Sequence, residues 1–369
     1  MDFILSESQH ELAALTRRIL ADRATPDRLR EVEAAGDRFD PALWADLAAA
    51  GVLAAALPED LGGAGLGLLD QCSVLAEIGR AVAPAPYLAS IVLGAGALAR
   101  FGAPDQQKRW AQPAGRGELV LTAALAEEEG APPVTAERAA GGGWRLTGTT
   151  TTVPAGPRAD LTLLPALSAH GVLVFLLERP DSRVIRAPQR LVDGDIAARL
   201  ELDGVELPEE RVLGGPEAGA AVADWLVSRA TVGLCALQLG IVERALELTS
   251  AYAKSRVQFD KPIGSFQAVA GRLADAYIDV EAVRLTMWQA AWRLAAGLPA
   301  ETEVATAKFW AADAGHRVAH TAVHIHGGVG IDTEYPVHRY FVAAKRAEFE
   351  LGGATAQLRR IGAALARAH

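Results

Sequence analysis

An arginine, an aromatic residue and an amide lie close together around a Pro-Ile-Gly turn: Arg256, Phe259 and Gln267. A guanidinium suits phosphate because its planar fork can donate two parallel hydrogen bonds to phosphate oxygens. An aromatic ring can cover the plane of an adenine or an isoalloxazine. A single arginine at a helix end is more often a solvated surface charge, but the three side chains together predict a site for a large planar ligand that carries phosphate.

Two adjacent glycines, Gly327 and Gly328, follow another helical stretch. Glycine at a helix end permits a positive φ, and the missing side chain also lets backbone N–H groups approach a ligand closely. Both uses are compatible at one position. His324 and His326 precede the glycines, but their spacing places them on different faces of a helix. These histidines therefore predict no metal pair.

The elements that would position these residues form three parts. Residues 1–115 have helical periodicity, residues 116–215 contain short β-type runs separated by Gly, Pro and Asp, and residues 216–369 are helical again. In the third part, three long helical segments, at roughly 265–296, 301–325 and 336–367, follow an apolar helix face that ends near Tyr252. The chain is therefore predicted to be mainly α, with a β middle domain and a C-terminal four-helix bundle.

Composition and charge exclude several classes of protein. The chain has 369 residues, of which 50% are hydrophobic, so a large buried core is expected. A net charge of −9 argues against nucleic-acid binding, which needs a basic surface. Cys72 and Cys235 are the only cysteines and have no metal or redox spacing, which favours buried, reduced thiols in a cytoplasmic protein. The sequence shows neither a signal peptide at its start nor an apolar run near the ~20 residues that span a bilayer.

The motifs described above resemble the flavin-binding signature of the acyl-CoA dehydrogenase family, and the resemblance extends over nearly the whole chain. The glycine-rich loop that begins at Pro58 and the Thr-Glu-Tyr-Pro segment that ends at Pro336 are similar to further family landmarks. The resemblance implies a helical domain, an antiparallel β barrel or sandwich, and a four-helix bundle. It also implies FAD as the cofactor, bound across a subunit interface. The residues implied to contact FAD are Arg256, Phe259, Gln267, His324, Gly327 and Gly328, with His324 in place of the usual Gln.

The middle part departs from the family pattern. Where family members carry a loop rich in hydroxyl groups against the flavin, this chain has the acidic stretch 126–133. Thr152-Val-Pro stands where an aromatic residue and a threonine commonly meet the flavin ring. The resemblance therefore implies weaker flavin contacts from this domain than in other members.

The reaction implied by the resemblance is α,β-dehydrogenation of an acyl-CoA thioester, with an electron-transferring flavoprotein as the electron acceptor. A carboxylate removes the α-proton in this reaction, and burial raises the basicity of such a group. An ungapped match to the family places Leu351 at the usual position of this base, and the family's alternative position falls near Ala230. Neither residue is a carboxylate, although Glu350 is adjacent to Leu351.

Three interpretations follow. A shifted register could let Glu350 act as the base of a self-sufficient homo-oligomer. The favoured interpretation is a base-lacking subunit of a heteromeric enzyme, like actinobacterial acyl-CoA dehydrogenases that pair two different chains. The third is a flavin-free scaffold that retains only the fold. The assembly is expected to be a dimer or a tetramer, and acyl-CoA is the expected substrate in the first two cases.

Overall fold

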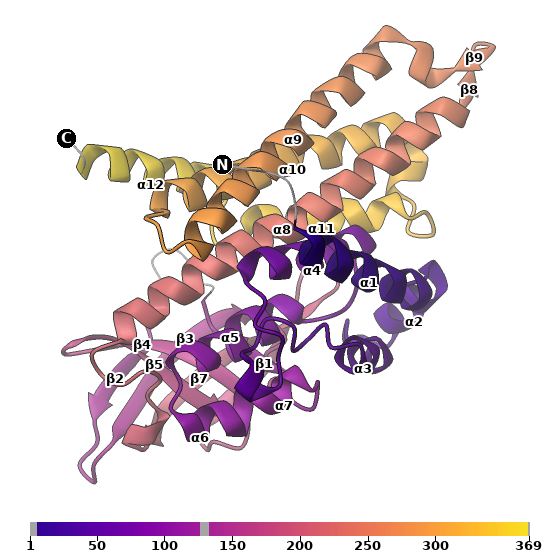
Figure 1. The fold of residues 1–369 in the computed structure, drawn as a ribbon. Helices are drawn as coiled ribbons and strands as arrows, with labels where there is room; N and C mark the ends of the chain where they lie inside the picture. The colour runs from indigo at the N-terminus through magenta and orange to yellow at the C-terminus, as the bar shows by residue number, and fades with distance from the viewer. Residues whose placement is uncertain (1–5, 126–132, 368–369) are drawn as a thin grey trace. The chain divides into compact units, whose positions relative to one another are not determined.

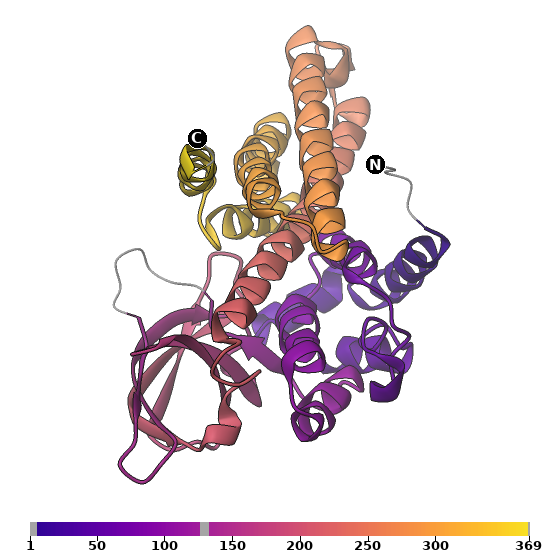
Figure 2. The ribbon, with the colours of Figure 1, turned by 60° about the vertical axis from the view of Figure 1, so that its left-hand side comes forward.

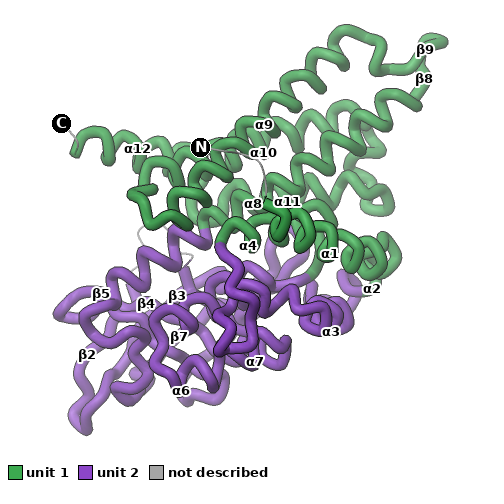
Figure 3. The backbone as a smooth tube through the Cα atoms, viewed as in Figure 1, with its two compact units in different colours: residues 1–31, 68–84, 231–369 green, residues 32–67, 85–230 purple. Residues whose placement is uncertain are grey.

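The computed structural model describes residues 6–125 and 133–367 (Figure 1). The acidic stretch expected to face the flavin therefore lies almost entirely outside the described residues. The chain forms two compact units, shown in different colours in Figure 3. Unit 1 consists of residues 1–31, 68–84 and 231–369, and unit 2 consists of residues 32–67 and 85–230.

Unit 1 is helical. Its helices are α1 (Glu7–Arg23), α4 (Leu68–Ala81), the later part of α8 (Gly219–Ser255), α9 (Gln267–Ala295), α10 (Glu301–His326), α11 (Val337–Phe349) and α12 (Ala354–Arg367). The central helix is α10, which packs against α9, α11 and α12, while α1 packs on α4. Helix α2 (Pro26–Ala34) follows α1. These elements confirm the predicted helix bundle.

One segment of this bundle differs from the prediction. The stretch 336–367 is two helices, not one, because the backbone turns sharply after Phe349. Leu351 and Gly352 both have positive φ, 60° and 91°, which no helix can accommodate. The Nε2 atom of Gln357, a fully buried residue, donates to the carbonyls of both turn residues at 3.0 Å. The amide of Gln357 therefore fixes the turn between α11 and α12.

Two glycines allow α4 and α8 to cross at backbone contact. A Cβ atom added at Gly79 would lie 2.0 Å from the carbonyl oxygen of Leu237, and one added at Gly240 would lie 1.9 Å from that of Ala76. Each helix thus presents a glycine to the other's main chain. This crossing brings α8 against the N-terminal helices of unit 1.

The core of unit 1 contains a fully buried lysine. Lys308 is fully buried on α10, and its Nζ donates to the carbonyls of Ala347 and Glu348 at 3.0 and 3.1 Å. Burial lowers the pKa of this ammonium group. The cation satisfies carbonyls that α11 leaves unpaired at its C-terminus, where the helix dipole favours positive charge.

Both cysteines of the chain are buried in unit 1, as predicted. Cys72 and Cys235 form no disulfide and have no exposed surface. Burial raises the pKa of Cys235 to about 12. The Cys235 thiol therefore stays protonated and unreactive while the unit is folded.

Unit 2 combines short helices with a sheet that curls on itself (Figure 2). The strands are β1 (Leu121–Ala123), β2 (Thr135–Arg138), β3 (Trp144–Val153), β4 (Leu161–Ser168), β5 (Gly171–Glu178), β6 (Val184–Arg190) and β7 (Ile196–Leu207). The sheet order is β1-β4-β2-β3-β7-β6, with β5 paired to β4. Pairs β1–β4 and β2–β4 are parallel and the others antiparallel. Trp144 and Phe175 meet edge to face in its core, 5.8 Å between centroids.

Short helical elements complete unit 2. They are α3 (Pro41–Ala49), η1 (Glu59–Leu61), η2 (Leu88–Ala95), α5 (Gly96–Phe101), α6 (Pro104–Gln106), η3 (Gln107–Ala111), α7 (Gln112–Gly115) and η4 (Glu209–Arg211). Asp40 begins α3 by accepting hydrogen bonds from the backbone N–H groups of Ala42 and Leu43. The glycine-rich segment after Pro58 contains η1 and otherwise forms loop, as predicted.

One helix among the described residues is long and apolar enough to cross a membrane by composition, namely α8. Of its apolar window, 72% is buried within the protein. That burial is what a core helix of a folded domain shows.

Candidate cofactor site

The first half of the predicted site is a hairpin between α8 and α9 (Figure 1). Its strands, β8 (Val257–Gln258) and β9 (Lys261–Pro262), pair antiparallel around the two-residue turn of Phe259 and Asp260. Both turn residues have positive φ, 51° and 62°, as a type I′ turn requires. Positive φ strains a residue such as phenylalanine, and strain of this kind concentrates at functional sites.

The turn presents Phe259 to solvent. This side chain is 87% exposed, and its ring meets the ring of Phe266 edge to face at 6.2 Å. The ammonium group of Lys261 lies 4.4 Å from the centroid of Phe266. An exposed aromatic ring, packed on a second ring that carries a cation, suits the planar, anionic ligand that the sequence predicts.

Arg256 lies at the base of the hairpin. Its backbone N–H donates to the Tyr252 carbonyl, and its carbonyl accepts from the Ile263 N–H, both at 2.8 Å. The side chain is exposed and forms no ion pair with any residue that the structure describes. The backbone of Arg256 is therefore held, while the guanidinium is available for an anion.

Gln267 is the first residue of α9 and is exposed. No side chain caps the start of this helix, because Phe266 precedes it. The N–H groups of Val269 and Ala270 donate to the carbonyl of Phe266 at 3.0 Å, so those of Gln267 and Ala268 are left without an intrahelical acceptor. A helix start of this kind favours negative charge. Arg256 at the base of the hairpin and Gln267 at the start of α9 are both exposed polar side chains.

The second half of the site is the C-terminus of α10. Gly327 follows the helix with φ 65° and ψ −142°, a conformation open in practice to glycine alone. Gly328 is exposed, and a Cβ atom added to it would meet nothing within 4 Å. The fold itself therefore requires glycine at 327 but not at 328. His324 is exposed one turn earlier.

The two halves lie at the same end of the helix bundle. The ring of His326, the last residue of α10, stacks on Tyr252 in the last turn of α8 with 4.3 Å between centroids. Because the N–H of Arg256 bonds to the carbonyl of that same tyrosine, the arginine and the diglycine turn share one neighbour. The structure thus brings together the elements that carry all six predicted cofactor residues.

The predicted base positions hold no free carboxylate among the described residues. Glu350 is not helical: it ends α11 with ψ 132°, and its side chain is 3.3 Å from Arg346. Leu351 follows in the left-handed region. Glu348 pairs with Lys345 at 2.5 Å and with His316 at 3.2 Å. Each acidic side chain near the usual base position is therefore engaged by a cation or a histidine.

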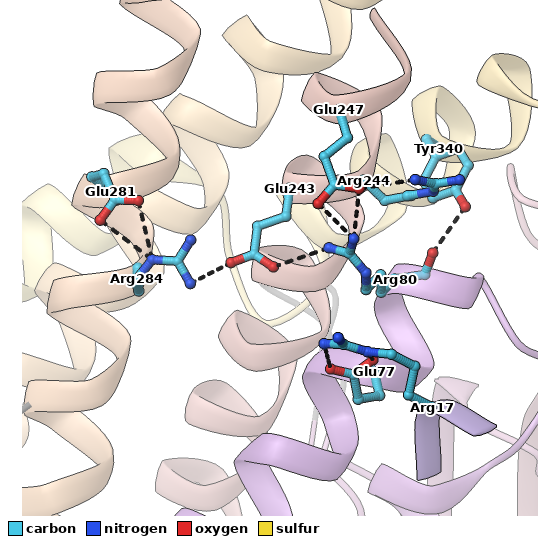
Figure 4. Close-up of polar contacts among 9 residues, drawn as sticks. All are labelled: Arg17, Glu77, Arg80, Glu243, Arg244, Glu247, Glu281, Arg284 and Tyr340. Carbon is cyan, nitrogen blue, oxygen red and sulfur yellow. Dashed lines mark hydrogen bonds and ion pairs between the residues drawn. The ribbon is translucent and has the colours of Figure 1, made fainter. Parts of the chain in front are cut away.

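The alternative base position is apolar, since Ala230 is buried on α8. A carboxylate further along α8, Glu243, belongs to an ion-pair network (Figure 4). It lies between Arg80 on α4, at 3.6 Å, and Arg284 on α9. Burial is the main cause that raises the pKa of Glu243, and both arginines oppose that rise. With two guanidinium partners, the carboxylate of Glu243 links α8 to both α4 and α9.

The same network reaches other helices of unit 1 (Figure 4). Arg80 also bonds to Glu247 at 2.5 Å, and Arg284 also pairs with Glu281 at 3.1 Å. The Tyr340 hydroxyl on α11 donates to the backbone carbonyl of Arg80 at 2.8 Å. Each arginine that pairs with Glu243 therefore pairs with a second carboxylate as well.

In unit 2, Thr152 has a positive φ of 53° at a bulge in β3. Its backbone N–H donates to the side-chain oxygen of Gln189 at 2.7 Å. A β-branched residue in this conformation is strained. Sequence patterns did not predict this strained backbone, which falls at the position where the resemblance places flavin contacts.

Comparisons with known proteins show the family of this chain. The models of the acyl-CoA dehydrogenase N-terminal and C-terminal domains match residues 6–118 and 217–366. Acyl-CoA dehydrogenase FadE27 of Mycobacterium tuberculosis is 50% identical, over 99% of each chain. The chain belongs to the acyl-CoA dehydrogenase family. It is thus an oxidoreductase of a flavin-dependent family, as the sequence resemblance predicted.

Solved structures place this acyl-CoA dehydrogenase near paired-chain members. A chain of the ChsE4–ChsE5 complex from Mycobacterium tuberculosis has a TM-score of 0.95 and 51% identity, with 99% of each chain covered. The Tcur3481–Tcur3483 steroid acyl-CoA dehydrogenase gives 0.91 and 40%, with 98% of each covered. Butyryl-CoA dehydrogenase from Megasphaera elsdenii gives 0.90 and 27%, with 99% of this chain and 100% of that one covered.

Sequence reasoning missed two buried residues of this dehydrogenase. His326 was considered only as a metal ligand, yet it is buried and joins the two halves. Lys308 carried no signal beyond a charged residue in an apolar helix, yet it supports the end of α11 from inside the core. Only the unusual cost of burying a lysine could have drawn attention to it.

Proposed function

We propose that this chain is one subunit of a FAD-dependent acyl-CoA dehydrogenase whose catalytic base comes from a homologous partner chain. The observation that carries the proposal is a contrast within the chain. The residues proposed to contact the cofactor are exposed. The family resemblance, in contrast, assigns the two positions of the base to Leu351, in a left-handed turn, and to the buried Ala230. Similarity to a chain of the ChsE4–ChsE5 complex supports the paired arrangement.

The residues present fit FAD. Arg256 has an exposed guanidinium with no ion pair in the described chain, and Gln267 is exposed after the hairpin, at an uncapped helix start. We assign the pyrophosphate to these two side chains. Phe259 would cover a ring of the dinucleotide. His324, Gly327 and Gly328 would take the adenosine end, where an added Cβ at Gly328 would point into open space.

The reaction assigned is removal of two hydrogens from adjacent carbons of an acyl-CoA thioester. A carboxylate takes the α-proton, the β-hydrogen leaves as hydride, and the Cα–Cβ bond becomes double. The chemistry that FAD supplies when bound is acceptance of this hydride. This chain would bind and orient the dinucleotide, and the turn at Leu351 would contribute an apolar wall where other members carry the base.

The partner and substrate classes follow from the relatives. We infer a heteromeric dimer or tetramer with a homologous chain, and a steroid acyl-CoA thioester is the substrate class that the Tcur3481–Tcur3483 enzyme suggests. An electron-transferring flavoprotein would receive the electrons. The proposed location is the cytoplasm, in line with two buried, reduced cysteines.

The test is the visible spectrum of the purified chain, alone and co-expressed with a homologue that has Glu where this chain has Leu351 or Ala230. We expect flavin absorbance and acyl-CoA oxidation from the co-expressed complex and no oxidation from the chain alone. If the chain alone binds flavin and oxidises an acyl-CoA, the partner-base proposal is wrong. Colourless protein under both conditions would instead favour a flavin-free scaffold.

A self-sufficient enzyme that uses Glu350 is the second candidate. It is favoured by the position of Glu350 next to Leu351, the residue that the family resemblance places at the usual position of the base. Its pairing with Arg346 at 3.3 Å opposes this role, because the ion pair must break before the carboxylate can reach a substrate. Undiminished turnover by Glu350→Gln in an active preparation would exclude this candidate.

A further inference from the structure

The ring of His326 is held between two tyrosines. It stacks on Tyr252 at 4.3 Å with 24° between planes, and it lies 5.4 Å from the ring of Tyr335 at 54°. Its Nδ1 lies 2.8 Å from the carbonyl oxygen of Ala322, and because a carbonyl can only accept, Nδ1 carries the proton. The residue is 4% exposed. This geometry fixes both the plane and the tautomer of the imidazole.

The other ring nitrogen has no partner. Nε2 is buried and makes no hydrogen bond within the described chain. A buried acceptor without a donor costs free energy, so the stacking and the Nδ1 bond must offset that loss. Leucine would fill the same apolar space without an unpaired buried nitrogen. Packing alone therefore does not account for a histidine at this position.

The ring joins three separate elements. Tyr252 belongs to the last turn of α8, and its carbonyl accepts the N–H of Arg256 at the base of the hairpin. His326 itself ends α10 and is bonded directly to Gly327. Tyr335 belongs to the segment that leads into α11. Movement of the hairpin relative to the diglycine turn would therefore break the stack.

We propose that His326 is a positioning residue that holds the Arg256 hairpin and the diglycine turn at the separation that a dinucleotide requires. The inference rests on the proposed binding of FAD. Without the ring, both elements would remain folded but would vary in distance, and a ligand that contacts both would lose the benefit of a preformed site. His326 would not touch the cofactor.

The first experiment needs no cofactor. Hydrogen exchange is measured on segments 256–263 and 326–331 in the apo protein, in wild type, His326→Ala and His326→Phe. We expect exchange in both segments to be several-fold faster in His326→Ala and close to wild type in His326→Phe, which keeps the stacked ring. His10→Ala, an exposed histidine on α1, is the matched control and should change neither.

The proposal would be overturned if His326→Ala exchanges no faster than wild type in both segments, or exchanges faster in 326–331 alone. If His326→Ala does not fold, Tyr252→Leu removes the other face of the stack and leaves α10 unaltered. Exchange of 326–331 must then rise in that variant, and an unchanged rate would equally overturn the proposal. These readouts do not depend on whether flavin binds.

The second experiment measures FAD affinity by fluorescence in the co-expressed complex. We expect His326→Ala to weaken FAD binding about tenfold, the order expected when two aromatic contacts are lost, with His326→Phe restoring most of it. Equal affinity of wild type and His326→Ala would overturn the proposal. A wild-type complex that binds no flavin would refute the proposed function, while the exchange result would still decide whether His326 couples the two segments.

Discussion

Exchanging glycine for alanine should have opposite effects at two kinds of helical position in unit 1. Gly79 and Gly240 lie where α4 and α8 cross, and an added Cβ would be 2.0 and 1.9 Å from carbonyl oxygens of the opposite helix. Gly271 lies on an exposed face of α9, and an added Cβ there would meet nothing within 4 Å. Alanine is the same substituent in all three variants, so only the surroundings differ.

The expected magnitudes follow from these distances. Alanine in a helix interior is favoured over glycine by about 1 kcal/mol, so Gly271→Ala should stabilise by about 0.5–1 kcal/mol. At Gly79 and Gly240 the clashing atoms are main chain, which cannot rotate away, so the helices must separate. Overpacking of this kind costs about 1–3 kcal/mol and occasionally more. We therefore expect a net loss of about 2 kcal/mol or more for Gly79→Ala and for Gly240→Ala.

The assay is thermal unfolding followed by circular dichroism at one fixed protein concentration, since assembly affects apparent stability. The two crossing variants should melt several degrees below wild type and Gly271→Ala slightly above it, because each kcal/mol shifts the midpoint by roughly 2–4 °C in proteins of this size range. The double crossing variant should lose less than the sum of the single losses, since one separation of the helices relieves both clashes. If Gly79→Ala melts at or above Gly271→Ala, the close crossing of α4 and α8 is wrong.

Three further predictions concern buried ionisable groups. Glu243→Gln should change the free energy of unfolding in urea by no more than about 1 kcal/mol, because both arginine partners keep another carboxylate and desolvation opposes the charge. The folded pKa of Glu243 is raised, so the favourable contribution of this group is complete below its ordinary pKa of 4.5 and is lost as pH rises. The variant should therefore become more stable relative to wild type between pH 4.5 and 7. Burial lowers the pKa of His326. The contribution of this group to stability should therefore be complete above its ordinary pKa of 6.5 and fall as pH decreases. His326→Phe should flatten this pH dependence of the melting temperature between pH 7.5 and 5. Lys308→Met leaves two carbonyls of α11 without a donor and should lower the free energy of unfolding in urea by about 1–3 kcal/mol. Equal stability of variant and wild type would show that Lys308 does not stabilise the end of α11.

Much of the fold could be predicted because its signals are local. Apolar periodicity located the long helices, and the run of β-type segments located the sheet of unit 2. The Pro-Ile-Gly turn and the diglycine indicated where helices end, since each depends on the conformational preferences of the residues present. The elements that carry the candidate site were identified for the same reason.

The break between α11 and α12 could not be predicted from such signals. Its turn places Leu351 in the left-handed region, which leucine disfavours, and the donors that stabilise it come from Gln357 on the next helix. The parallel strand pairs of unit 2 likewise depend on contacts between distant segments. His326 was missed because its burial depends on two tyrosines from other elements.

The position of the two thiols gives the protein a built-in reporter. Cys72 and Cys235 both lie within unit 1 and unit 2 has none, so a thiol-tagging reagent can react only when unit 1 opens. The tagging rate therefore measures how often thiols of the helical unit become exposed. This measurement needs no engineered label, because the native cysteines supply the reactive groups.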